Sequence, residues 1–402
     1  MDDVVIIDAV RTPIGRYKGA LKDVRPDDLG AIVIKGLLDR NPNLPASDID
    51  DVIFGNANGA GEENRNVARM SLLLAGLPET ISGTTINRLC GSGLDAVSVG
   101  ARAIMAGEED IIIAGGTESM TRAPFVMAKP STEFPRGNME MYDTTIGWRF
   151  VNPRLNEMYG TDSMPETAEN VAKRYHISRE EQDEFALKSQ KKARKAVEAD
   201  LFKDEIIPVV YTDRKGNEHI IDQDEHPRPD STLEKLNKLN PIFPDGTVTA
   251  GNASGVNDGA SAILLMSKRR AEELGLKPLA KFTSSATAGV EPAVMGIGPI
   301  SSTQKLMKKT GLTVNDFDLI ELNEAFASQS LECMRQLGLA VDKVNVNGGA
   351  IALGHPLGAS GARILTTLVH EMKRRDVNRG LATMCIGVGQ GISVCIERVN
   401  KS

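Results

Sequence analysis

Residues 43–58 read NLPASDIDDVIFGNAN, and residues 311–326 return to a similar pattern as GLTVNDFDLIELNEAF. A second pair follows in the same order, because SGLDAVSVGARAIMAG (92–107) and PLGASGARILTTLVHEM (356–372) share a small-residue start and the triplet GAR before an apolar helix. Ordered self-similarity of this kind indicates a duplicated unit. We therefore expect two homologous α/β halves.

The regions around these segments alternate between short apolar runs and helical patterns. IIIAGGTE (111–118) corresponds loosely to MCIGVGQG (384–391), the opening VVIIDAV (4–10) is typical of a strand, and apolar residues recur at helical spacing over 27–38. Strands that alternate with helices indicate a mostly parallel sheet covered on both faces. The predicted fold class is a duplicated, layered α/β fold.

The segment between the two halves has a different composition. It holds the only tryptophan, Trp148, and the proline-rich stretch DEHPRPD. The sequence thus predicts a first half over residues 1–120, completed by about 251–272, an inserted loop domain over 121–250, and a second half over 273–402.

The overall composition is typical of a soluble, reduced, cytoplasmic protein. The 402 residues carry a formal charge of −7, which disfavours nucleic acid as a partner because proteins that bind it are usually basic. We expect no membrane segment, since no apolar run approaches the length of a bilayer. The cysteines at 90, 333, 385 and 395 show no CxxC spacing, so we expect free thiols and no metal site.

Cys90 lies in NRLCGSG (87–93), after an extended TTIN stretch and before a predicted helix. The partial positive charge and free amides at a helix start lower the pKa of a thiol and can receive an oxyanion. The alternative is a buried structural cysteine, which is common for this residue type. The Gly-Ser-Gly that follows favours a nucleophile.

His355 lies in NGGAIALGHPLGASGAR (347–363), a glycine-rich apolar turn. A cysteine nucleophile needs such a placed imidazole to take its proton. The alternative is a core histidine whose hydrogen bonds are satisfied. The other histidines lie in charged or helical contexts that we expect at the surface: His176, His219, His226 and His370.

Cys385 ends an apolar strand in MCIGVGQG, and the glycines after it would expose amides for a second oxyanion. Asn323 and Glu324 follow the predicted strand DLIEL, where the alternative role for Asn323 is a helix N-cap. Cys333 and Cys395 are expected in the core. Two thiols and one imidazole suggest that one thiol carries an acyl group while the other handles the proton of a carbon acid.

Five segments, in this order, resemble the thiolase family across nearly the whole chain: NRLCGSG, GNASGVNDGA, NEAFA, GGAIALGHPLGASGAR and CIGVGQG. The resemblance implies a thiolase-like fold, with two duplicated layered α/β halves and an inserted loop domain. It also implies an acyltransferase that cleaves 3-oxoacyl-CoA with coenzyme A as co-substrate, has no permanently bound cofactor, and assembles as a homotetramer or homodimer.

The resemblance further implies a role for each matching residue. Cys90 would take the acyl group, with His355 as the base that activates its thiol, and Cys385 would give or take the α-proton of acetyl-CoA. Asn323, acting through a water, and His355 would form one oxyanion hole, and the amides of Cys90 and Gly387 would form the other. The positions that match coenzyme A contacts are Met164, Arg228, Phe243, Ala250, Ser254, Ala325 and Phe326.

Departures from the common thiolase pattern narrow the range of acyl groups that the substrate could carry. Many thiolases read CxGGGxG at the last motif, where this chain has Val388, and Ser163 replaces a histidine of short-chain biosynthetic thiolases. With DTTIGWRFVNP (143–153), these features most resemble 3-oxoadipyl-CoA thiolases of aromatic-compound degradation. The terminal carboxylate of such a substrate needs a cation nearby. Arg149 is the candidate, and an ordinary surface arginine is the alternative.

The sequence leaves three alternative functions to consider. The first is an acetoacetyl-CoA or general 3-oxoacyl-CoA thiolase. The second, a condensing synthase of related fold, is disfavoured because such enzymes place a histidine where Cys385 lies. The third, a non-catalytic acyl-CoA carrier, is disfavoured by the presence of Cys90, His355 and Cys385 together.

Overall fold

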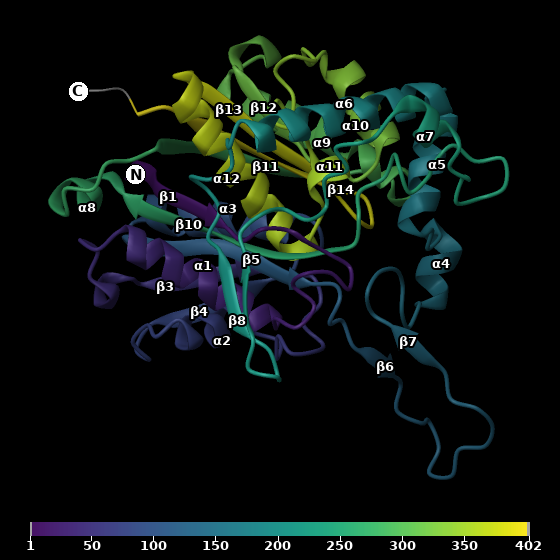
Figure 1. Ribbon diagram of the computed structural model, residues 1–402, viewed down its shortest axis with the longest axis horizontal. Helices are drawn as coiled ribbons and strands as arrows, with labels where there is room; N and C mark the ends of the chain where they lie inside the picture. Colours follow the sequence, from purple (N-terminus) through teal and green to yellow (C-terminus); the bar gives the residue numbers. More distant parts are fainter. Residues whose placement is uncertain (1, 400–402) are drawn as a thin grey trace.

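The N-terminal half contributes five neighbouring strands to one large sheet (Figure 1). We describe residues 2–399 of a computed structural model of the chain. The strands of this half lie in the order β1–β10–β5–β3–β4. Its elements are β1 (Val4–Arg11), β2 (Gly15–Arg16), α1 (Pro26–Arg40), β3 (Asp51–Gly55), α2 (Val67–Leu74), β4 (Ser82–Ile86), α3 (Ser92–Ala106), β5 (Ile111–Ser119), β10 (Asn257–Ser267) and α8 (Lys268–Glu273).

The C-terminal half repeats this arrangement in the order β11–β14–β13–β12. Ile320 of β12 also forms a parallel bridge to Val344, at the place that β4 takes beside β3. The direction of each strand pairing also repeats, so the predicted duplicated α/β fold is confirmed. Its elements are β11 (Ala280–Gly289), α9 (Gly298–Thr310), β12 (Leu319–Leu322), α10 (Ala327–Leu337), α11 (Ala350–Leu353), α12 (Leu357–Arg375), β13 (Arg379–Ile386) and β14 (Gln390–Glu397).

Two details of the sequence interpretation are wrong. The sheet is parallel at β5–β3, β3–β4 and β12–β13, but antiparallel at the other junctions of the path. The pattern of alternation missed this because β14 follows β13 through a short turn, and β10 enters the sheet after a long insertion. The strand register also changes one of the sequence repeats, because the sequence alone paired residues 111–118 with residues 384–391. Asp51 pairs with Ile112 and Leu319 pairs with Gly380, so residues 111–118 correspond to 379–386.

The helices cover both faces of the sheet and form a central layer between the halves. In β1, Ile6 faces the core built on α3 and α12, whereas Val5 faces the core built on α1. Because both faces are covered, β1 is apolar along most of its length. Helices α9 and α10 cover the outer face of the second half through residues such as Leu306 and Met334.

The first turns of α3 and α12 are in direct contact at two glycines. A Cβ atom on Gly93 would lie 2.7 Å from a backbone oxygen of α12, and one on Gly361 would lie 2.2 Å from a backbone nitrogen of α3. No larger residue fits such an approach without a backbone shift. The contact brings together the two segments that immediately precede these helices, which contain Cys90 and His355.

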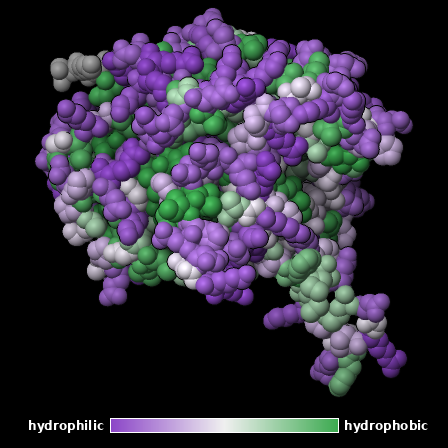
Figure 2. Space-filling view, viewed as in Figure 1, coloured by the Kyte–Doolittle hydropathy of each residue, from purple (hydrophilic) through white to green (hydrophobic). Residues whose placement is uncertain are grey.

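The inserted segment first projects as an arm and then runs over the second half. Figure 1 shows the β6–β7 hairpin extending away from the body, and Figure 2 shows apolar side chains along it. Exposed apolar residues of this arm include Phe125, Met127, Phe134, Met139 and Met141. The elements of the segment are β6 (Phe125–Met127), β7 (Met141–Asp143), α4 (Pro153–Tyr159), α5 (Met164–Arg174), α6 (Arg179–Glu198), β8 (Val209–Thr212), β9 (Glu218–Ile221) and α7 (Leu233–Asn237).

The cysteines are all free, and Cys333 and Cys395 are buried in the core, as the sequence predicts. Among the helices of residues 2–399, none is both long enough and apolar enough to cross a membrane.

Candidate active site

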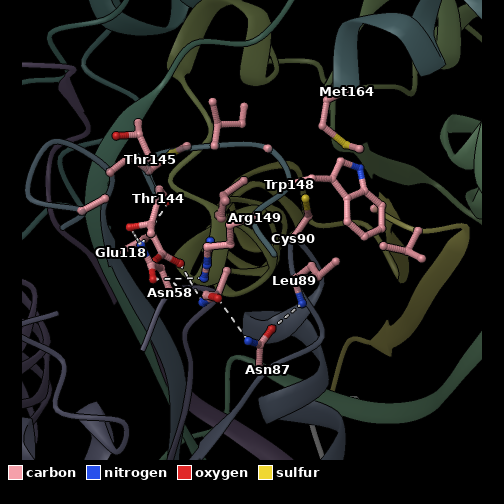
Figure 3. Close-up of a pocket in the computed structure, with 18 of the residues that line it drawn as sticks. Asn58, Asn87, Leu89, Cys90, Glu118, Thr144, Thr145, Trp148, Arg149 and Met164 are labelled. Carbon is pink, nitrogen blue, oxygen red and sulfur yellow. Dashed lines mark hydrogen bonds between the residues drawn. The ribbon is translucent and has the colours of Figure 1, made fainter. Parts of the chain in front are cut away.

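Cys90 lies in a cavity of about 320 Å³ to which both halves and the inserted segment contribute (Figure 3). The first half supplies polar residues at the ends of its strands, the inserted segment supplies a wall, and the second half closes the cavity with two loops. Residues that represent these three sources are Asn58, Glu118, Thr144, Trp148, Arg149, Met164, Leu357, Gly387 and Val388.

The Cys90 thiol is half-buried just ahead of α3. Burial raises the pKa of this thiol to about 11, although the backbone amides of Gly387 and of Cys90 itself act in the opposite direction. The expectation that the helix start would lower this pKa is therefore wrong, because desolvation outweighs the amides. At neutral pH the thiol is protonated and needs a base to become a nucleophile.

His355 is buried and its tautomer is set by a serine. Ser360 Oγ donates to Pro356 O at 2.9 Å, so it accepts a hydrogen bond from His355 Nδ1 at 2.5 Å. The lone pair therefore lies on Nε2, which is buried and has no partner among the described residues. Burial, followed by the charge of Arg363, lowers the pKa of His355 to about 3, so the imidazole is neutral and can accept a proton.

Asn257 holds the turn that carries His355. Its Oδ1 accepts from the His355 backbone N–H at 2.9 Å, and its Nδ2 donates to Gly15 O at 3.0 Å. The adjacent Gly354 has φ +102°, and a Cβ atom there would lie 2.7 Å from the Asn257 amide. Sequence reasoning gave Asn257 no role, because its segment GNASGVNDGA and the histidine motif are distant in sequence and meet only in the fold.

Two other histidines are buried, which corrects the expectation that they lie at the surface. His370 sits in the central helix α12 with Nε2 2.8 Å from Ala9 O. His226 lies within the inserted segment with Nδ1 3.2 Å from Asn257 Nδ2, and burial lowers its pKa to about 4. Polar neighbours in the sequence concealed this burial, because each histidine is covered by residues that are distant in the sequence.

Cys385 lies near the end of β13 and is 1% exposed. Burial, followed by the charges of the nearby thiols Cys90 and Cys333, raises its pKa well above the usual value. Cys385 belongs to a contact cluster with Phe326 and Met164, and Met164 also lines the cavity of Cys90. The two thiols therefore belong to one site.

Asn323 does not cap a helix, which removes the alternative role, because α10 starts after Phe326. Its side-chain amide is buried, and neither Oδ1 nor Nδ2 has a hydrogen-bond partner among the described residues. Its neighbour Glu324, by contrast, accepts from Ser189 Oγ at 2.7 Å and from Asn345 Nδ2 at 2.9 Å. Glu324 thus fixes the end of β12, and the Asn323 amide remains free to bind another group.

Leu89 and Val388 adopt left-handed backbone conformations with φ +46° and +65°, and both line the Cys90 cavity. Such a conformation is strained for a β-branched residue such as Val388. Val388 lies in the turn between β13 and β14, next to Gly387, whose amide acts on Cys90. This strain is therefore located where the turn must hold that amide against the thiol.

The predicted coenzyme A positions are divided among several hollows. Ala325 and Phe326 belong to the cluster with Cys385 and Met164, and the Ser254 N–H donates to Ala325 O at 2.9 Å. Arg228 and Ala250 line a separate cavity of about 230 Å³ with His226, and Phe243 lines another of about 690 Å³. Ser163, which replaces a histidine of some thiolases, forms the capping box of α5 with Glu166.

Comparisons with known proteins find similarity over nearly the whole chain. The family model for the thiolase N-terminal domain matches residues 4–269, and the model for the thiolase C-terminal domain matches residues 276–398. The chain is 58% identical over 402 residues to the 3-oxoadipyl-CoA/3-oxo-5,6-dehydrosuberyl-CoA thiolase of Escherichia coli K12, covering 99% of this chain and 100% of that protein. It is 57% identical over 400 residues to the beta-ketoadipyl-CoA thiolase of Pseudomonas aeruginosa, covering 99% of each. The crystal structure of the Bacillus anthracis acetyl-CoA acetyltransferase matches with a TM-score of 0.92 and 41% identity over 99% of each chain.

Proposed function

Because this chain belongs to the thiolase family, we propose that it cleaves 3-oxoadipyl-CoA with coenzyme A to acetyl-CoA and succinyl-CoA. The observation that carries the proposal is the position of Cys90 in a cavity that Gly387 also lines, where the backbone amide of Gly387 acts on the thiol. Full-length similarity to thiolases named for this substrate supports the choice of 3-oxoadipyl-CoA as the substrate.

In the first half-reaction, Cys90 attacks the 3-keto carbon while its proton passes to Nε2 of His355. The neutral imidazole and the free Nε2 support this role. The carbonyl oxygen becomes an oxyanion, which the amides of Cys90 and Gly387 would stabilise. When the carbonyl re-forms, the bond between C2 and C3 breaks and leaves a succinyl thioester on Cys90.

The departing acetyl-CoA enolate takes a proton at C2 from the Cys385 thiol. Its raised pKa supports this role, because the thiol remains protonated until the enolate forms. The free amide of Asn323, through a water, and His355 would hold the enolate oxygen. Coenzyme A then returns a proton to Cys385 and attacks the thioester, and Cys90 leaves with the proton from His355.

Coenzyme A is proposed to bind as a co-substrate beside both thiols, with no permanently bound cofactor. Met164, Ala325, Phe326 and Ser254 would contact the part nearest the reaction, since they lie around Cys385. The more distant parts of coenzyme A would reach residues in the two neighbouring hollows: Arg228, Phe243 and Ala250.

We propose that the projecting arm joins copies of the chain into a tetramer or dimer. Phe134 is 87% exposed and Phe125 is 66% exposed on this arm, and exposed apolar surface of this kind marks association sites. The domain division proposed from the sequence places the arm in the inserted loop domain, residues 121–250, between a first half of residues 1–120 completed by about 251–272 and a second half of residues 273–402. The four free cysteines support a reducing, cytoplasmic location.

The test compares thiolysis of 3-oxoadipyl-CoA with that of acetoacetyl-CoA by the purified protein, together with intact-protein mass spectrometry. We expect kcat/KM to be at least about tenfold higher for 3-oxoadipyl-CoA and a succinyl adduct on Cys90. Cys395→Ala is the control, because this buried thiol lies in another core and its loss should leave the adduct intact.

Two results would contradict the proposal in different ways. A clear preference for acetoacetyl-CoA would support a general thiolase, which is the alternative favoured by the similarity to the Bacillus anthracis acetyl-CoA acetyltransferase. Absence of any acyl adduct on Cys90 would instead support a carrier of the same fold.

A further inference from the structure

Arg149 brings a positive charge to the cavity of Cys90 without a carboxylate partner among residues 2–399. The guanidinium is half-buried, and its Nη2 donates to Asn58 Oδ1 at a long distance of 3.4 Å. Arginine side chains in protected sites usually bind a planar anion through two parallel hydrogen bonds. Arg149 therefore retains donors that face a reaction cavity.

Asn58 is held in the orientation that presents its oxygen to Arg149. Its Nδ2 donates to both Thr144 O at 3.2 Å and Thr144 Oγ1 at 2.9 Å, which leaves Oδ1 for the guanidinium. Its backbone N–H donates to Glu118 Oε1 at 3.2 Å. The inserted segment thus supplies the cation, and the first half of the fold sets its position.

Glu118 lines the same cavity but does not form a salt bridge with Arg149. Its two oxygens accept from the backbone amides of Ala57, Asn58 and Gly358 and from the side chain of Asn56. Burial raises the pKa of Glu118 to about 7, although these amides oppose the shift. Arg149 is thus the one cationic side chain among the described residues that line this cavity, and no described carboxylate forms a salt bridge with it.

The placement of Arg149 relative to Cys90 matches a short acyl chain with a charged end. Figure 3 shows Arg149 on one side of Cys90, beside Asn58 and Thr144, while Trp148 and Met164 lie on the other side. In the succinyl thioester, the terminal carboxylate is only a few bonds away from the sulfur. An acyl group could therefore extend from Cys90 towards Arg149 as coenzyme A occupies the Met164 side.

We propose that Arg149, positioned by Asn58, binds the terminal carboxylate of the substrate and selects 3-oxo dicarboxylic acyl-CoA thioesters. The inference rests on the proposed function and deepens it by naming the residue that sets the substrate class. An acyl-CoA with a neutral end would leave the guanidinium desolvated and unpaired. Its binding is therefore disfavoured, in addition to lacking the ion pair.

The test first measures equilibrium binding of adipyl-CoA and hexanoyl-CoA, which differ only at the terminal group and lack the 3-oxo group needed for cleavage. Cys90→Ala protein is used as the background, since it cannot accept the acyl group. We expect adipyl-CoA to bind at least about tenfold more tightly, and Arg149→Met to remove that preference. Arg154→Met is the matched control, because this arginine is exposed on α4 in the same segment.

Kinetics with Cys90 intact then separate the two proposals. For thiolysis of 3-oxoadipyl-CoA, Arg149→Met should lower kcat/KM by about 30- to 100-fold, with less than about threefold change for 3-oxohexanoyl-CoA. Arg149→Lys should give an intermediate kcat/KM for 3-oxoadipyl-CoA, because lysine keeps the positive charge but lacks the two parallel donors of the guanidinium.

Equal losses on both substrates, or an unchanged binding preference in Arg149→Met, would overturn the role of Arg149 and leave the thiolase function intact. If Arg149→Met removes the preference for adipyl-CoA but the wild-type protein cleaves neither 3-oxoadipyl-CoA nor 3-oxohexanoyl-CoA, the role of Arg149 is supported and the proposed function is overturned.

Discussion

The two halves of the molecule share a strand order but carry different chemistry just ahead of their central helices. In the first half, Cys90 precedes the central helix α3, and in the second half, His355 precedes its counterpart α12. The glycine contact between these helices brings the two helix starts together. The fold thus places a thiol and an imidazole at the adjacent starts of the two central helices.

The sheet strands show the same contrast. By the register, Thr117 of β5 occupies the place that Cys385 takes in β13. Thr117 Oγ1 donates to Pro26 O at 2.8 Å and is a structural residue, whereas the Cys385 thiol packs beside Met164 at the reaction cavity. The first half therefore provides the nucleophile and the open cavity wall, while the second provides buried proton-transfer groups.

The largest effect should come from separating the two thiols. We expect Cys90→Ala to abolish acyl-enzyme formation, and Cys385→Ala to keep acylation of Cys90 by acetyl-CoA while lowering thiolysis by at least about 1,000-fold. Mass spectrometry and thiolysis rates measure the two steps. Cys395→Ala, in a separate core, should behave as the wild type. Rapid acylation of the Cys90→Ala protein would refute the division of labour between the halves.

The pH dependence of Cys90 alkylation tests whether the nucleophile and its base are both neutral in the resting protein. Because burial raises the pKa of Cys90 to about 11 and lowers that of His355 to about 3, the resting pair is neutral. The thiolate fraction then increases as pH rises, so the rate of Cys90 alkylation should grow about tenfold per unit from about pH 7 to pH 9. Iodoacetamide labelling followed by mass spectrometry measures it. A plateau near neutral pH would indicate a thiolate–imidazolium pair instead.

The smallest effect should come from one glycine in each of the two central helices. In Gly361→Ala the new Cβ would lie 2.2 Å from the backbone of α3, whereas in Gly100→Ala it would lie 3.1 Å from a methyl group of Ile112, which can move. Both changes gain the same helix propensity. We expect Gly361→Ala to cost about 1–3 kcal/mol of unfolding free energy, and Gly100→Ala to be within about 1 kcal/mol of the wild type. Thermal unfolding measures both, and equal Tm values would exclude a critical contact between the helices.

Much of the fold and the reactive residues could be predicted from the sequence because they depend on local patterns. The repeat of residues 43–58 at 311–326 indicated the two halves, and the small residues around Cys90 and His355 indicated reactive turns. Other features could not be predicted, because they depend on distant contacts. The pKa of Cys90 follows from burial rather than from its helix, and the burial of His226 follows from the course of the inserted segment.

Short segments of the chain are enough to identify the family, the duplicated halves, the two thiols and the imidazole. Only the folded chain shows which strands are antiparallel, how Asn257 holds His355, and that Arg149 lines the cavity of Cys90 rather than the outer surface. The physical reason is that solvent exclusion and hydrogen-bond partners are set by segments that lie far apart in the chain and meet only when it folds.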